Sequence, residues 1–283
     1  MIGVKVRNYR GELLAISNDR YPVIDVQGLT PAGATVNASG VGISDGTFFN
    51  SSYVNQRNIV LTLVPNNAPE EARLELYQYF KPKHKIRLYF ETELRHVYID
   101  GYVETFEGSL FANRQSFQAS IICPQPFFKD VDREDHTFYQ SLISDEFEFE
   151  FAIDPPGVIF GEILEGSELN VQNLGEEETG LLVTLVANNV VRNPVIYNNT
   201  THQFYRLNTS LIAGDMVRIN SNRGQKSVTL NRQGTVYNII NDMAQGSSWL
   251  MLPQGNNMMM FSAGYGAVNL EVSYEIDLLY QGV

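Results

Sequence analysis

Few side chains in this sequence have the types and spacing that catalysis or metal binding requires. The single cysteine, Cys123, has no evident basic partner that would stabilise a thiolate, so we expect a buried structural thiol. None of the four histidines is spaced from a cysteine or carboxylate as zinc ligands are; they are His84, His96, His136 and His202. We therefore predict no catalytic, cofactor-binding or metal-binding residues and no cofactor.

Two runs of carboxylates could be interpreted as sites. Glu176-Glu177-Glu178 could supply the acid and base of a glycosidase, but the run lies between Gly175 and Gly180, where a solvated turn is the ordinary explanation. Asp130 to Asp135 could suggest calcium, yet the run lacks the glycine and the distal glutamate of a helix-loop-helix calcium site. No nucleophile elbow, phosphate loop or dinucleotide fingerprint occurs. The sequence predicts that the protein is not an enzyme.

The charge of the chain is concentrated in one span. The net charge is −12, and residues 131–180 carry 14 acidic and 1 basic side chains, whereas the regions on either side are nearly balanced. Nucleic-acid binding needs clustered positive charge, which is missing, so a DNA-binding protein is excluded. No apolar run reaches the roughly 18 residues that span a bilayer, so we expect no membrane insertion. One cysteine fits synthesis in a reducing cytosol.

The elements that would position these residues are mostly strands, in keeping with many Val, Tyr, Phe and Thr residues. One helix is expected after Asn66 or Asn67, with Pro69 in its first turn, an apolar stripe, and Pro82 beyond its end. Residues 29–46, rich in Gly, Ala and Ser, predict a long loop or an irregular hairpin. Alternating residues predict strands over 3–7, 12–17, 21–27, 57–64, 85–91, 95–106 and 116–122. We interpret residues 1–130 as an α+β domain with one helix.

The rest of the chain divides into an acidic connector, 131–157, and a second domain, 158–283. Within the connector, residues 145–151 alternate between carboxylates and phenylalanines, which predicts a strand. From Val158 onward, expected strands recur about every ten residues with turn signals between them, and only residues 236–243 suggest a helical turn. This spacing predicts an antiparallel β-sandwich.

A proline-rich hexapeptide, Cys123-Pro124-Gln125-Pro126-Phe127-Phe128, closes the first domain. Its two prolines end the preceding strand and favour an extended segment. We expect the two phenylalanines that follow to pack against the domain as an anchor. A domain-ending linker is the plain interpretation. The hexapeptide also resembles the signature that closes the N-terminal domain of siphophage distal tail proteins, and it lies at the corresponding position in the chain.

Further motifs in the second half follow the order found in the same family. They are Asn193-Pro194-Val195-Ile196-Tyr197-Asn198, Ala213-Gly214-Asp215 leading into a strand, Trp249, and Pro253-Gln254-Gly255-Asn256-Asn257. The resemblance covers nearly the whole chain and implies a galectin-like antiparallel β-sandwich in the second domain. Larger relatives insert carbohydrate-binding modules into this sandwich, and the present chain has no room for one.

The resemblance implies a structural virion protein, a hexameric hub at the distal end of a phage tail. Its partners would be five further copies of itself, the tail-tube protein, and the tail-tip or receptor-binding assembly. DNA would pass through its channel without specific binding. It would be assembled in the host bacterial cytoplasm and reside in the virion. We expect the first domain to make the ring, with the loop over 29–46 lying against a neighbouring subunit.

The sequence also leaves a second function open. The sandwich could be a carbohydrate-binding module that contacts host cell-surface glycans, with Trp249, Tyr265 or Tyr237 as the platform for a sugar. Trp and Tyr residues on a sandwich more often belong to its core or to an interface.

Overall fold

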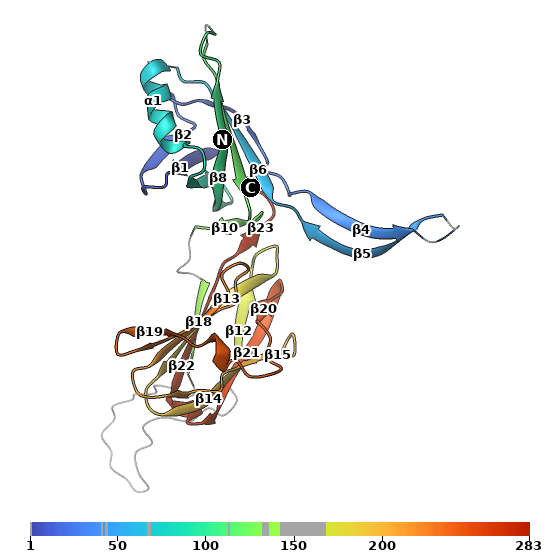
Figure 1. Cartoon of the computed structure of the whole chain (residues 1–283), viewed down its shortest axis with the longest axis vertical. Helices are drawn as coiled ribbons and strands as arrows, with labels where there is room; N and C mark the ends of the chain where they lie inside the picture. The colour runs from blue at the N-terminus through green and yellow to red at the C-terminus, as the bar shows by residue number, and fades with distance from the viewer. Residues whose placement is uncertain are drawn as a thin grey trace. The chain divides into compact units, whose positions relative to one another are not determined.

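The computed structural model describes residues 2–40, 42, 45–66, 69–112, 114–131, 136–141 and 168–283. The chain forms two compact units, shown in Figure 1. The first unit comprises residues Met1–Asp132 together with Leu279–Val283, and the second comprises Arg133–Leu278. The expected strand over 145–151 and the carboxylates at 132–135 lie outside the described residues.

A nine-stranded antiparallel sheet forms the first unit. Its main path runs β2-β1-β7-β8-β9-β6-β3, and β10 pairs with both β8 and β23. The strands are β1 (Gly3–Arg7), β2 (Leu13–Ile16), β3 (Val23–Gln27), β6 (Arg57–Leu63), β7 (Lys85–Glu91), β8 (His96–Gly108), β9 (Phe117–Cys123), β10 (Phe128–Asp130) and β23 (Leu279–Tyr280). β4 (Ala34–Gly40) and β5 (Thr47–Val54) form a separate two-stranded sheet.

Helix α1 (Pro69–Tyr79) is the one α-helix among the described residues, as the sequence predicts. Its inner face carries Ala72 and Leu76, and both are fully buried together with Phe80, which follows the helix. The Phe80 ring stacks on Phe106 of β8 at 5.4 Å, and Phe106 stacks in turn on Phe117 of β9 at 5.8 Å. The helix thereby closes the apolar core that the alternating residues of the sheet supply.

The second unit contains two antiparallel sheets. One runs β11-β22-β13-β17-β18-β19 with β20 paired to β13, and the other runs β12-β21-β14-β15 with β16 paired to β14. Their bounds are β11 (Thr137–Ser141), β12 (Leu169–Asn173), β13 (Thr179–Ala187), β14 (Val191–Asn198), β15 (Gln203–Arg206), β16 (Ser210–Leu211), β17 (Met216–Asn220), β18 (Ser227–Arg232), β19 (Thr235–Asn238), β20 (Met251–Leu252), β21 (Gly255–Tyr265) and β22 (Leu270–Ile276), with 3-10 turns η2 (Ile240–Asp242) and η3 (Ala267–Asn269). The fold class, mostly β with one helix and an antiparallel β-sandwich, is confirmed.

Buried side chains tie the two sheets of the sandwich together. The hydroxyl of Tyr274 on β22 donates to Oε1 of Gln140 at 2.8 Å, and Nε2 of Gln140 donates to the carbonyl oxygen of Met259 on β21 at 3.3 Å. Burial raises the pKa of Tyr274 far above its ordinary value, so its hydroxyl stays protonated as a donor. These two hydrogen bonds link the two sheets of the sandwich at one point.

One sequence expectation is settled by the structure and another needs correction. For residues 29–46, expected as a long loop or an irregular hairpin, the hairpin is confirmed, because residues 34–40 form β4, which pairs with β5 across a bulge and extends away from the nine-stranded sheet (Figure 1). Residues 279–283 do not belong to the sandwich. They return to the first unit because Leu279 and Tyr280 pair with Lys129 and Phe128 of β10.

Candidate assembly site

The proline-rich hexapeptide ends strand β9 and leads into β10 at the edge of the first unit. Cys123 is fully buried, and this desolvation raises the pKa of its thiol to about 12. Phe128 is fully buried and meets Phe90 of β7 edge to face, with ring centroids 5.8 Å apart. Phe127 is only half-buried, so the anchor rests on Phe128.

A buried guanidinium holds this region together. Nε of Arg57 donates to the carbonyl oxygen of Pro126 at 2.6 Å, and Nη2 donates to that of Gln281 at 2.6 Å. Nη1 donates to the carbonyl oxygens of Gly28 at 2.5 Å and Thr30 at 2.6 Å. We call these five residues the Arg57 clasp. It joins three segments that lie far apart in the sequence.

The Arg57 clasp is buried and tightly packed. Arg57 is only 3% exposed, and its guanidinium carbon lies 4.5 Å from the centroid of the Phe128 ring. Desolvation lowers the pKa of Arg57, but the group remains a cation at any physiological pH. Gly28 has φ +87°, and a Cβ there would lie 2.2 Å from the carbonyl oxygen of Asn58, so only glycine fits.

Sequence reasoning missed the clasp, although one signal points to it. Arg57 opens β6, where Ile59, Leu61 and Leu63 are the buried residues. The two-residue period of a strand places Arg57 on the same core-facing side. A charged residue in phase with a buried apolar face must be hydrogen-bonded, so this position already implied carbonyl or carboxylate partners.

The last residues of the chain are held by a second arginine of the first unit. Nη1 of Arg95 donates to the carbonyl oxygen of Gly282 at 2.6 Å, and its guanidinium carbon lies 4.7 Å from the ring centroid of Tyr280. The amide of Val283 donates to the carbonyl oxygen of Leu29 at 3.1 Å. Residues 279–283 thus support the same segment, 28–30, from which the β4–β5 hairpin departs.

The β4–β5 hairpin has two unlike faces and little support of its own. Between Asp25 and Arg57 the sequence contains one charged residue, Asp45. The strand register places an apolar set on one face and a mainly polar set on the other, with a bulge at Asn50. We name them, by their larger side chains, the apolar face (Ala34, Val36, Ala38, Phe49 and Val54, with Gly40, Thr47 and Ser52) and the polar face (Thr35, Asn37, Ser39, Phe48, Ser51 and Tyr53).

Exposed hydrophobic side chains are the unusual feature of the hairpin, and they include Phe48 and Tyr53 on the polar face as well as two residues of the apolar face. Val36 is 62% exposed and Phe49 is 66% exposed. On the other face, side-chain bonds join Asn37 to Ser51 at 3.0 Å and Asn50 to Ser39 at 2.5 Å. Among the described strands, β4 and β5 pair only with each other, and isolated hairpins are marginally stable in water. The apolar face therefore has the properties of a surface that another protein covers.

In the sandwich, the motif residues make tight turns. Gly214 has φ +86° and leads into Asp215, which is buried and accepts hydrogen bonds from Arg232, with Nη2 of Arg232 2.5 Å from Oδ2, and from the amide of Ile212 at 2.9 Å. Gly255 has φ +96°, and Asn257 beyond it donates to the carbonyl oxygen of Pro253 at 3.0 Å. These motifs serve the fold of the sandwich.

The structure does not bring together the three aromatic residues considered as a sugar platform. Trp249 packs against Tyr205 with ring centroids 5.4 Å apart, and Nζ of Lys226 lies 5.4 Å from its ring centroid. Tyr237 belongs to β19 and Tyr265 ends β21, which are strands of different sheets. Together they do not make one surface.

Groups that could do chemistry are likewise scattered. Among the described residues, no three His, Cys, Asp or Glu side chains gather as metal ligands do. His84 stacks on Tyr9 at 4.3 Å, and Glu178 forms an ion pair with Arg223 at 3.1 Å.

No helix in the described part of the chain has the length and apolarity to cross a bilayer.

Comparison with known proteins first shows what the second unit is similar to. Residues 174–276 match the family model of the siphovirus-type tail component, C-terminal domain, so this part of the second unit is similar to that domain. The whole chain has the fold of the SPP1 Dit protein, described as a paradigm of the hub adsorption apparatus in phages that infect Gram-positive bacteria, with a TM-score of 0.67 at 11% identity over 98% of this chain and 99% of that one. The resemblance to siphophage distal tail proteins predicted from the sequence is confirmed.

Two structures of the phage P2 baseplate in its activated conformation are also similar. The chain in the calcium form gives a TM-score of 0.58 at 14% identity over all of both chains, and that in the strontium form gives 0.59 at 14% identity over 98% of both. No curated protein matches this sequence. At these identities the solved structures show the fold alone.

Proposed function

We propose that the protein is a hub subunit at the distal end of a phage tail, assembled as a homo-hexamer around a DNA channel. The observation that carries the proposal is the match to the SPP1 hub protein, which extends over both units and almost the full length of both chains. The family match of residues 174–276 supports the same assignment independently of the first unit.

The β4–β5 hairpin supplies the contact between neighbouring copies in this proposal. Its apolar face loses exposed hydrophobic area when a second copy covers it, at about 25 cal/mol per Å² removed from water. The desolvation free energy of this contact is small, because no charged side chain of β4 or β5 has to leave water. A heterologous contact of this kind closes into a ring when the rotation between copies permits it.

In the virion, the ring would join the tail-tube protein to the tail-tip or receptor-binding assembly. DNA would pass through the ring without being held, since a conduit lined by clustered Lys and Arg would retain it. In the first unit several cations have carboxylate partners. Lys85 and Arg87 both pair with Asp100, and Lys5 pairs with Glu91.

The test compares two adjacent phenylalanines of the hairpin in the full-length chain. Phe49 lies on the apolar face and Phe48 on the polar face, and they are 66% and 65% exposed. Light scattering should give about six times the 31.9 kDa chain mass for the wild type. Phe49→Asp should give the mass of a single chain, because it buries an unpaired carboxylate in the contact. Phe48→Asp is the matched control and should keep the ring.

Two results would contradict the proposal at different levels. A wild-type protein that is monomeric at all concentrations, and that shows no rings in negative stain, would exclude the hexameric hub. A ring that survives Phe49→Asp but is lost in Phe48→Asp would keep the hub and assign the contact to the other face. Unchanged circular dichroism in both variants would show that the fold is intact.

A further inference from the structure

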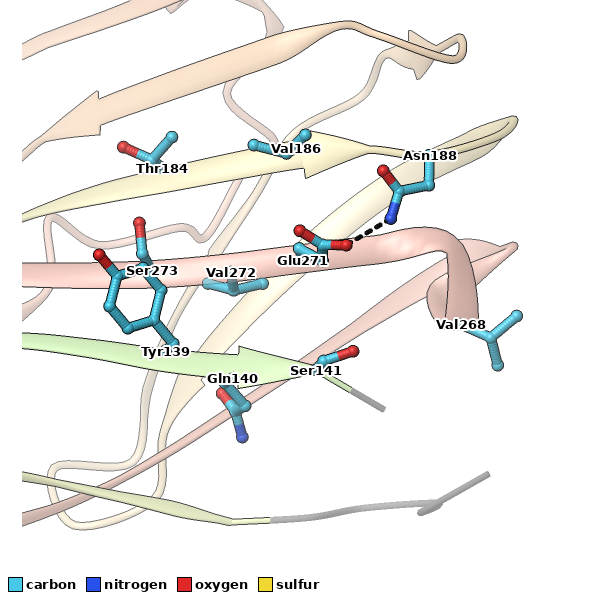
Figure 2. A pocket seen from close by; sticks show the side chains of 10 residues that line it. All are labelled: Tyr139, Gln140, Ser141, Thr184, Val186, Asn188, Val268, Glu271, Val272 and Ser273. Atoms are coloured by element: carbon cyan, nitrogen blue, oxygen red, sulfur yellow. Dashed lines mark hydrogen bonds between the residues drawn. The ribbon is translucent and has the colours of Figure 1, made fainter. Parts of the chain in front are cut away.

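A hollow opens on the outer face of the larger sheet of the sandwich. Its volume is about 570 Å³, and strands β11, β22 and β13 form its floor. Asn188 and Val268 lie at its end, as Figure 2 shows. Sites for small molecules usually have volumes of about 300–1,000 Å³, so the size of this hollow suits a small ligand.

The residues of the hollow come into register across the three strands. Tyr139 pairs with Ser273, and Ser273 pairs with Thr184, so an aromatic ring and two hydroxyls lie in one row. Tyr139 is 76% exposed on the edge strand, with its ring beside Ser273 in Figure 2. An exposed tyrosine next to hydroxyl groups offers an apolar ring face and hydrogen-bonding groups on the same surface.

A carboxylate and an amide occupy the far end of the hollow. Nδ2 of Asn188 donates to Oε1 of Glu271 at 2.6 Å, which orients both groups (Figure 2). A carboxylate has about four lone-pair sites, so Glu271 retains acceptor capacity beyond this bond. Glu271 stands between Ser141 and Val186 in the strand register. It can therefore accept hydrogen bonds from a ligand that reaches the row of Tyr139.

The composition of the hollow selects among classes of ligand. Among the described residues of the lining, Glu271 is the one charged side chain, and its negative charge disfavours phosphates, nucleic acids and acidic peptides. Valine methyls and the Tyr139 ring favour a ligand with an apolar side. Hydroxyl, amide and carboxylate groups favour one with several hydroxyls. A neutral pyranose sugar has both, with C–H groups on its ring faces and hydroxyls around its rim.

We propose that the hollow around Tyr139 and Glu271 is a binding site for a neutral saccharide. The pyranose ring stacks on Tyr139, and its hydroxyls donate to Glu271 and exchange hydrogen bonds with Ser273 and Thr184. This site is separate from the β4–β5 hairpin and does not rest on the hub assignment. It gives the sandwich a glycan contact without any inserted module.

The experiment measures saccharide binding to the full-length protein by saturation-transfer NMR and calorimetry. The probes are the methyl pyranosides of glucose, galactose and mannose, N-acetylglucosamine, and glucuronic acid as an anionic counterpart. At least one neutral sugar should bind, and glucuronic acid should bind at least about tenfold more weakly, since it brings a second carboxylate to Glu271. Tyr139→Ala and Glu271→Gln should each weaken binding at least about tenfold.

Matched controls are Tyr237→Ala and Tyr265→Ala, which remove exposed tyrosines elsewhere on the sandwich. Both should bind as the wild type does. Failure of every neutral sugar to bind, or binding that persists in both Tyr139→Ala and Glu271→Gln, would overturn the proposal. Loss of binding in Tyr265→Ala or Tyr237→Ala alone would place the sugar elsewhere and overturn it as well. Glu271→Gln keeps the shape of the side chain, so its effect does not depend on refolding.

Discussion

The two units use different polar groups to hold their irregular segments. In the first unit, one buried cation donates to four carbonyl oxygens from residues 28, 30, 126 and 281. In the second, buried neutral amides do the same work over shorter spans. Asn173 donates to the carbonyl oxygens of Glu177 at 2.9 Å and Leu252 at 3.0 Å, and accepts from the amide of Gly175 at 2.9 Å.

The difference follows from geometry. A guanidinium offers five donors in a fixed fork, so it can serve several segments that converge from different parts of the chain. A side-chain amide has two donors and an acceptor on a short stem, which suits a single loop and its neighbour. The convergence of segments at the Arg57 clasp therefore depends on one residue, while the second unit spreads this task over Asn173, Asn198 and Asn257.

Removal of the cation should have the largest effect. Arg57→Ala leaves four carbonyl oxygens without their donor, and we expect a loss of about 3–5 kcal/mol in the unfolding free energy of the first unit. Urea denaturation measures this loss. Hydrogen exchange should locate it, with faster exchange at residues 128–130 and 279–283.

Arg57→Lys is the matched control for the clasp. An ammonium keeps the charge but cannot reach all the acceptors of a planar fork, so its loss should be intermediate. If Arg57→Ala unfolds at the wild-type urea concentration, the clasp does not stabilise the unit. If Arg57→Lys equals the wild type, charge alone is sufficient and the fork geometry is irrelevant.

Removal of one amide should have a smaller and more local effect. Asn173→Ala strips the donors from two carbonyls and the acceptor from the Gly175 amide, at a cost of about 1–3 kcal/mol confined to the second unit. Asn170→Ala, on the same strand, removes an exposed bond to Asn256 and should change stability by less than about 0.5 kcal/mol. Equal effects of the two substitutions would contradict the assigned role of the buried amide.

Among the buried groups compared, Asp215→Asn should have the smallest effect at neutral pH. Asn can still accept from the amide of Ile212, and Arg232 is more than a third exposed, so the lost ion pair costs about 1 kcal/mol. Hydrogen bonding from Arg232 lowers the pKa of Asp215, so its contribution is present above about pH 4 and is lost as the pH falls toward the lowered value. The variant should show a flatter decline of thermal stability as the pH falls below about 4. An unchanged decline would exclude this contribution.

Most of the regular structure was predictable, because alternation and turn residues are local signals. Helix α1 and strands β7 to β9 fall where the sequence places them, since each has its own apolar pattern. The hairpin was predicted only as an alternative to a loop, because small and uncharged residues give weak alternation. The return of residues 279–283 was missed, since a two-residue strand has no periodicity and its partner β10 is about 150 residues away.

The same physical limits apply to the candidate sites. The phenylalanine anchor was predicted as a pair, whereas burial distinguishes Phe128 from Phe127. Tyr139 could not be singled out from the sequence, because its neighbours Ser273 and Thr184 become adjacent only through strand pairing. Local patterns thus predict elements, and sites assembled from distant strands require the register.

The pairing of β10 with β23 also has a consequence for synthesis. The ribosome produces residues 1–132 first, but their sheet lacks β23, and Arg57 lacks one of its four acceptors, until residues 279–283 emerge. The contacts of residues 279–283 with the first unit span a long stretch of sequence, so they raise its contact order and form late in folding. Nascent chains would therefore reach the fully clasped state only after the sandwich has been translated, which delays the mature first unit until residues 279–283 have been made.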